Sequence, residues 1–278
     1  MCGAVAMFAC LDATAKFLGG HMDPLQATWA RYTSALVLTS FIFNPVTRPG
    51  LLRTQRPMLQ LVRSVLLLAS TLLNFIAIQY LQLDQALSIL FSLPLLVAIL
   101  SGPILGEWVG WRRWTAIMVG FAGVLLVTRP GHGGIHPAAL FSVAAALSLA
   151  LYNIATRALA SSDSNETTLF YSNFVGALLM IPIVPFVWTT PSDPLVVFLM
   201  VLIGAFGAFG HYLLIAGHRF APASVLAPFV YTQMVWVIAL GFLVFGQLPN
   251  RWTLTGAAIV VASGLYLLYR ERKVKGEA

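Results

Sequence analysis

Asp12 and Lys16 are an acid and a base four positions apart inside an otherwise apolar segment. On a helix they would share one face, with the acid N-terminal to the base, which is the better order for an ion pair. If the segment crosses a membrane, each bare charge costs about 2.5–3.5 kcal/mol, so such residues normally face a partner or a water-filled cavity. The spacing predicts a group that contacts a charged substrate or, alternatively, a pair that only anchors the helix end.

Arg31 lies about two turns into the next apolar segment. A guanidinium there needs a partner such as Asp12 or a substrate carboxylate, unless it extends to the membrane interface. Asp12 is the one carboxylate well inside an apolar segment, which makes it the first candidate for proton coupling. Glu107 lies at a segment end, where capping or pairing with Arg112 or Arg113 is expected.

The other candidate contacts are uncharged donors, acceptors and aromatic rings within apolar segments. A mostly apolar pocket with a few such groups suits a neutral or zwitterionic molecule with a bulky apolar part. Each residue alone would also fit an interhelical hydrogen bond. The candidates for substrate binding are Asn74, Gln79, Ser92, Tyr152, Asn153, Tyr171, His211, Tyr212, Tyr231, Gln233 and Trp236.

Two prolines interrupt apolar segments in the two halves of the chain. Pro94 and Pro228 are expected to bend their helices and to free backbone carbonyls near the centre of the molecule. We interpret them as candidate hinges, with a bend needed only for packing as the alternative.

Motifs for catalysis are missing from the sequence. His211 and His218 are seven positions apart, but no HExxH, GxSxG or paired acids accompany them, and no glycine-rich phosphate loop follows a strand. We therefore expect no enzyme, no cofactor and no metal.

The composition indicates that lipid is the solvent. The 278 residues are 59% hydrophobic and 9% charged, with a mean hydropathy of +0.86, which leaves too few charges to cover a water-soluble domain. A span needs about 20 apolar residues, and about ten spans fit. The expected fold is an all-α polytopic membrane protein with spans at 3–19, 25–43, 61–82, 85–105, 111–128, 137–159, 167–188, 195–217, 222–244 and 252–269.

Two stretches 140 residues apart look like copies of one unit. Leu105-Gly106-Glu107 and Phe245-Gly246-Gln247 each lead into a further apolar segment. Two five-helix repeats are predicted, residues 1–130 and 131–278, joined near Arg129. Because five is odd, the second copy would be inverted, which places a substrate site near mid-depth between the halves.

The basic residues predict the orientation. Twelve of the 16 cluster on one side: Arg48, Arg53, Arg56 and Arg63 around one loop, Arg112, Arg113, Arg157 and Arg219 at others, and Arg270, Arg272, Lys273 and Lys275 in the tail. Both termini should therefore be cytoplasmic, in the inner membrane. Topology accounts for the net charge of +7 without nucleic acid.

Several short pieces together resemble the drug/metabolite transporter superfamily, specifically its EamA-type ten-helix transporters. They are Asp12-Ala13-Thr14-Ala15-Lys16, Trp29-Ala30-Arg31-Tyr32, Ser92-Leu93-Pro94-Leu95, Leu105-Gly106-Glu107 and Tyr152-Asn153. Gln247 departs from the pattern, which often has Glu there. The resemblance implies a carrier of small organic metabolites, often an exporter of amino acids.

We therefore predict a secondary transporter that exports amino acids or related metabolites by alternating access. The alternatives are an importer of a larger metabolite such as S-adenosylmethionine or riboflavin, and a lipid-linked flippase. A channel is less consistent with a cavity enclosed by internal duplication. The expected partners are a small-molecule substrate and the lipid bilayer, and a monomer is compatible with this architecture.

Overall fold

The structure is a computed structural model that describes residues 1–80, 89–128, 137–246 and 251–276. All regular elements in these ranges are helical. The first half contains α1 (Cys2–Leu18), α2 (Pro24–Ile42), η1 (Pro49–Leu52), α3 (Pro57–Tyr80), α5 (Leu93–Leu105) and α6 (Trp111–Thr128). The second contains α7 (Ala139–Leu159), α8 (Asn165–Met180), η2 (Val184–Phe186), α9 (Pro194–Phe220), α10 (Ala223–Leu226), η3 (Ala227–Thr232), α11 (Gln233–Phe245) and α12 (Arg251–Gly276).

Local chemistry fixes several helix ends. The Asp23 carboxylate accepts a hydrogen bond from the Leu25 N–H, and Pro24 occupies the first helical turn of α2. α5 and α11 both end at a glycine in the left-handed region, Gly106 with φ 71° and Gly246 with φ 65°. A glycine adopts this conformation without steric cost, so the repeated glycine ends the helix in the same way in both halves.

Three expected spans differ from the structure. α8 ends at Met180 rather than near 188, because Pro182 and Pro185 cannot continue a helical hydrogen-bond ladder. The 222–244 segment is interrupted by η3, and α12 extends to Gly276. The first part of the expected 85–105 span and the 129–136 linker lie outside the described residues.

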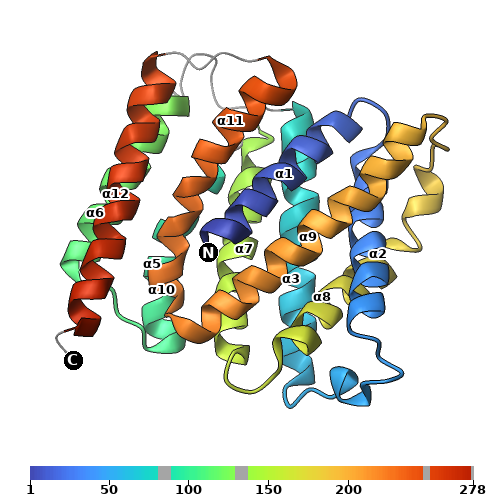
Figure 1. The fold of residues 1–278 in the computed structure, drawn as a ribbon, viewed down its shortest axis with the longest axis horizontal. Coiled ribbons are helices and arrows are strands. Elements are labelled where there is room, and N and C mark those ends of the chain that lie inside the picture. Colours follow the sequence, from blue (N-terminus) through green and yellow to red (C-terminus); the bar gives the residue numbers. More distant parts are fainter. Residues whose placement is uncertain (81–88, 129–136, 247–250, 277–278) are drawn as a thin grey trace.

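Helices of the first half pack mainly against helices of the second half. α1 packs against α9 and α7 against α3, while α11 packs against α1 and α5 against α7. α6 and α12 pair with each other and stand at one end of the molecule, with α2 and α8 toward the other (Figure 1). These contacts bring α1, α3, α7 and α9 together in the middle, where the polar residues lie.

The exterior is apolar enough for lipid. Exposed large side chains include Phe41, Val65, Phe198, Phe209 and Leu243. Among the described residues, four helical stretches are long and apolar enough to cross a membrane, Pro57–Ala77, Ala139–Leu159, Pro194–Phe220 and Ala223–Val244, and two shorter apolar helices accompany them.

Candidate functional site

Arg31 lies on α2 with its guanidinium inside the helix bundle, where the residue is 4% exposed. Its Nη1 donates to Thr71 Oγ1 at 2.7 Å, and its Nη2 lies 2.8 Å from His211 Nε2. The guanidinium carbon lies 4.6 Å from the centre of the Tyr32 ring. The buried Nε has no hydrogen-bond partner, and Gly207 faces it, since a Cβ added there would lie 3.2 Å from Nε. The Nε–H of this cation is therefore a buried donor without an acceptor in this conformation.

His211 continues the chain of polar contacts into the second half. Its Nδ1 lies 2.9 Å from the Tyr152 hydroxyl, which also accepts a hydrogen bond from Arg63 Nη2 at 2.9 Å. We call Thr71, Arg31, His211, Tyr152 and Arg63 the buried polar chain. It joins α2 and α3 of the first half to α7 and α9 of the second.

Arg63 is fully buried, at 0% exposure, near the start of α3. Its Nε donates to Thr156 Oγ1 at 2.7 Å, and its Nη1 donates to Ser172 Oγ at 2.5 Å and to the Thr168 carbonyl at 3.1 Å. The basic-residue pattern grouped it with the arginines around one loop, whereas the structure buries its side chain within α3. The available signal was its position inside an expected span, where a charge usually has a functional or structural role.

The two arginines have no carboxylate within ion-pair distance among the described residues. A buried charge is costly unless hydrogen bonds or a counter-ion compensate it. Neutral oxygens and the His211 nitrogen provide that compensation in this conformation. The interior of the bundle therefore holds two arginine side chains whose hydrogen bonds, within the described ranges, go to neutral groups.

Asp12 lies nearby on α1. Its Oδ2 accepts a hydrogen bond from Gln233 Nε2 on α11 at 2.7 Å, and the Arg31 charge acts on it electrostatically. Within the described ranges no ion pair joins Asp12 to Lys16, which is exposed near the end of α1. A carboxylate from the first half and an amide from the second thus form a polar contact close to the buried polar chain.

The other predicted contacts are dispersed. Asn74 is half-buried on α3, three residues after Thr71. Ser92 and Asn153 donate to carbonyls of their own segments, those of Ile89 and Leu149. The Gln79 side chain lies outside the described part of the structure. The structure therefore brings together Asp12, Arg31, Tyr152, His211 and Gln233.

Four aromatic residues that were predicted to contact the substrate make no hydrogen bond or ring contact with the buried polar chain in the described part of the structure. The Tyr171 hydroxyl donates to the Leu52 carbonyl at the surface, and Tyr212 stacks on Phe43 with ring centres 6.0 Å apart. Tyr231 is buried and donates to the Ile117 carbonyl at 3.4 Å. Trp236 is 45% exposed.

Both candidate hinge prolines lie at helix interruptions. Pro94 lies in the first turn of α5, directly after a turn at residues 91–92, and not in mid-helix as expected from the sequence. Pro228 lies in η3, between α10 and α11. The interruptions are thus present in both halves, and the hinge role stays a prediction.

A second polar cluster joins the two halves at one end of the bundle. Glu107 Oε1 accepts from Arg157 Nε at 2.8 Å, and its Oε2 accepts from the Ala223 N–H at 2.9 Å. Arg157 also donates to the His218 carbonyl at 2.6 Å. Glu107 was expected to pair with Arg112 or Arg113, but the fold supplies Arg157 from the other half.

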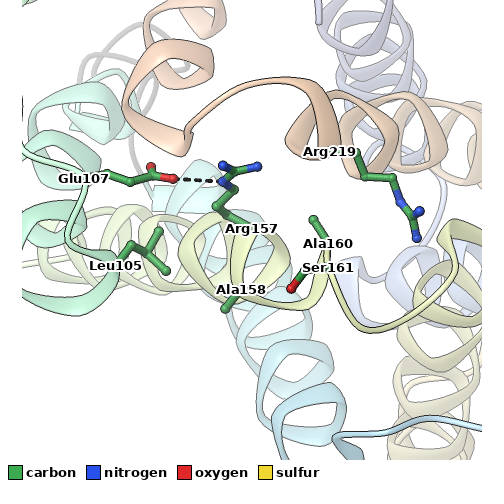
Figure 2. A pocket seen from close by; sticks show the side chains of 7 residues that line it. All are labelled: Leu105, Glu107, Arg157, Ala158, Ala160, Ser161 and Arg219. Carbon is green, nitrogen blue, oxygen red and sulfur yellow. Dashed lines mark hydrogen bonds and ion pairs between the residues drawn. The ribbon is translucent and has the colours of Figure 1, made fainter.

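A cavity of about 330 Å³ opens beside this ion pair. Figure 2 shows Arg157 directed toward Glu107, whereas Arg219 points away from them. The lining residues are Leu105, Glu107, Arg157, Ala158, Ala160, Ser161 and Arg219.

Asp163 holds the adjoining loops together. Burial would raise the pKa of its carboxyl, but hydrogen bonds from Thr54, the Gln55 N–H and Gln60 hold that pKa below its usual value. Its contribution to stability is therefore present above about pH 4 and is lost at lower pH, as the carboxylate becomes protonated. Between pH 5 and 8 it stays ionised.

An all-helical bundle with an apolar exterior and a buried chain of polar side chains between its halves defines a polytopic membrane protein. Comparison with known families identifies the family of membrane proteins. Residues 1–129 and 136–270 match the EamA-like transporter family, and the chain belongs to that family. The resemblance inferred from the short sequence pieces is confirmed, as is the helical membrane fold.

Curated relatives cover nearly the whole chain. The chain is 29% identical over 263 residues to an S-adenosylmethionine uptake transporter of Rickettsia felis, a match that covers 94% of this chain and 88% of the relative. It is 30% identical over 276 residues to a riboflavin transporter of Vibrio cholerae, with 96% and 90% covered. A solved crystal structure superposes with a TM-score of 0.78 at 19% identity, over 98% of this chain and 97% of that one, which shows the shared fold.

Proposed function

We propose that this chain is an alternating-access carrier for metabolites with an α-amino-acid head group, S-adenosylmethionine included. The observation that carries the proposal is the buried Arg31 guanidinium, which keeps an unpartnered Nε–H and lies close enough to Asp12 for their charges to interact. An α-amino acid presents a carboxylate and an ammonium group. Arg31 would bind the carboxylate through two parallel hydrogen bonds, and Asp12 would bind the ammonium.

The carrier is built from two inverted five-helix copies, residues 1–130 and 131–278, in the inner membrane. The exchange of packing partners between the halves and the matching glycines at Gly106 and Gly246 support this arrangement. With Arg63 removed from the loop count, eleven basic residues still lie on one side against four on the other. That balance favours cytoplasmic termini.

Uptake is the direction we favour over the export expected from the sequence. The relative in Rickettsia felis, and a further one in Rickettsia prowazekii, are S-adenosylmethionine uptake transporters. The end of the bundle closed by Glu107 and Arg157 carries the 106–110 and 160–164 loops, which this orientation places in the cytoplasm. A carrier closed at that end presents its binding groups from the opposite side first.

Counterflow in proteoliposomes tests the proposal. Vesicles containing the purified protein and unlabelled S-adenosylmethionine should transiently accumulate radiolabelled S-adenosylmethionine from outside. Arg31→Lys should lower the initial rate by about tenfold or more, because an ammonium cannot replace the planar fork of the guanidinium. Asp12→Asn should lower it as well.

Arg48→Lys is the matched control, since Arg48 is exposed in a loop, and it should transport like the parent protein. Counterflow of riboflavin without counterflow of S-adenosylmethionine would contradict the substrate class. Unchanged rates in both Arg31→Lys and Asp12→Asn would remove these residues from the site.

A further inference from the structure

Hydrogen-bond chemistry fixes the protonation state of His211 in this structure. An arginine guanidinium only donates hydrogen bonds, so His211 Nε2, at 2.8 Å from Arg31 Nη2, must carry a lone pair. The imidazole is then neutral, with its proton on Nδ1. That proton points to the Tyr152 oxygen at 2.9 Å, which also accepts from Arg63.

A protonated His211 is incompatible with this arrangement. Both ring nitrogens of an imidazolium donate, so Nε2 and Arg31 would present two donors to each other. The charged and titratable groups that face His211 are Arg31 from α2, Tyr152 from α7 and, behind Tyr152, Arg63 from α3. α1 presents the apolar Phe8 ring, with ring centres 4.7 Å apart. The contact between Arg31 and His211 therefore exists only while His211 is neutral.

We propose that His211 is the proton-binding site of a proton-coupled carrier. The proposal rests on the proposed function, in which a substrate carboxylate binds Arg31. A carboxylate that engages the Arg31 guanidinium replaces His211 as its hydrogen-bond acceptor. The released Nε2 then takes a proton from the water on the open side, and the adjacent carboxylate stabilises the resulting imidazolium.

The contact between Arg31 and His211 also explains how His211 releases its proton on the other side of the membrane. When the substrate leaves, Arg31 regains His211 as its acceptor, and Nε2 must release its proton to the water there. Substrate and proton therefore cross together. In this cycle the Asp12 carboxylate binds the substrate ammonium and the Gln233 amide.

Thermodynamic linkage makes the coupling measurable without transport. If substrate binding lets His211 take a proton, S-adenosylmethionine added at matched pH to the purified protein in weakly buffered detergent should withdraw protons from solution. A pH-sensitive dye reports this uptake. Binding of S-adenosylmethionine with no proton uptake would overturn the proposal, whatever any variant does.

His211→Gln is the decisive variant. A glutamine offers an oxygen acceptor to Arg31 and an N–H donor to Tyr152, but it does not titrate between about pH 5 and 8. In proteoliposomes, an inward proton gradient should raise the initial rate of S-adenosylmethionine uptake several-fold in the parent protein. In His211→Gln the gradient should give no increase over the same variant without a gradient.

His218→Gln is the matched control on the same helix. His218 is also buried, and its Nε2 has no hydrogen-bond partner, which makes it the rival proton site on α9, besides Asp12 on α1. The control should respond to the gradient as the parent does. A gradient response that persists in His211→Gln, or that is lost equally in His218→Gln, would overturn the assignment. If the parent protein shows counterflow but its uptake does not respond to the gradient, proton coupling is refuted and the proposed function stands. If the parent protein shows no counterflow, both the proposed function and the proton coupling are refuted.

Discussion

The two buried arginines differ in how completely their donors are used. Arg63 donates from all three of its nitrogens to groups on α7 and α8, whereas Arg31 keeps a free Nε–H beside Gly207. A guanidinium that donates from each of its nitrogens ties helices together, whereas one with an unpaired Nε–H keeps a donor for which the described part of the chain supplies no acceptor. We therefore assign Arg63 to the scaffold and Arg31 to binding.

Replacing Arg63 with methionine tests this division. The Arg63→Met variant removes the hydrogen bonds that Arg63 donates to Tyr152, Thr156 and Ser172, and interhelical hydrogen bonds in membranes are worth about 0.6 kcal/mol each on average. We expect a loss of about 2 kcal/mol, observed as a melting temperature lower by about 5 °C in detergent. Arg53→Met, at an exposed loop position, should melt like the parent. Equal melting temperatures for Arg63→Met and Arg53→Met would show that the hydrogen bonds of Arg63 do not stabilise the fold.

At the scale of the elements, the close contact of α2 with α9 positions Arg31. Gly204 is the point of closest approach, because a Cβ added there would lie 1.9 Å from Ser34 Oγ and 2.6 Å from the Ala35 nitrogen. The Ala35 nitrogen and the nearby Arg31 carbonyl, at 2.8 Å, are backbone atoms of α2, so no side-chain rotation relieves the clash. The absence of a side chain at Gly204 therefore sets the distance between the two helices.

Gly204→Ala should push α2 away from α9 and displace Arg31 from His211. Overpacking of this kind costs about 1–3 kcal/mol. We expect lower thermal stability in detergent together with slower S-adenosylmethionine counterflow. Gly217→Ala is the control in the same helix, since its added Cβ would meet only Leu226 Cδ1 at 3.7 Å. A Gly204→Ala variant as stable and active as Gly217→Ala would show that a methyl group fits between α2 and α9 without displacing them.

At the scale of the whole molecule, the two halves meet through polar contacts at two depths. The buried polar chain lies inside the bundle, and the contacts of Glu107 and Asp163 join loops at one end. In the proposed uptake cycle the end contacts stay closed while the interior binds its substrate, and they open to release the substrate into the cytoplasm. The proposed inversion of the halves has a direct consequence, because equivalent loops must lie on opposite sides of the membrane.

Single cysteines placed in two exposed loops measure this orientation. Thr47→Cys follows α2, and Ser192→Cys precedes α9. In a background with Cys2 and Cys10 replaced, a membrane-impermeant maleimide added to intact cells with a permeabilised outer membrane should label only the cysteine at 192. The cysteine at 47 should react after the inner membrane is disrupted. Labelling of both from the same side would contradict the inverted architecture and the cytoplasmic termini.

Sequence alone determined the class of the molecule. Apolar run lengths, the scarcity of charges and the spaced glycines at 106 and 246 predicted a helical membrane protein and its family, because these features depend on local chain chemistry and on lipid as the solvent. The sequence also predicted helix boundaries where a proline or a glycine determines them, as at Gly106. The end of α8 differs from the prediction because residues 181–188 are apolar enough to continue a span, whereas Pro182 and Pro185 cannot continue the helix.

Only the tertiary structure decided which polar residues meet. Arg31 and His211 are 180 positions apart, and Tyr152 and Arg63 are 89 apart, so no local pattern relates them. Thr71 gave no signal at all, since a hydroxyl in a helix commonly bonds to its own backbone, as Thr71 also does to Leu67. Which polar residues become partners depends on how whole helices pack. That packing is set by many residues at once, including the glycines Gly204 and Gly207, whose missing side chains allow a close approach.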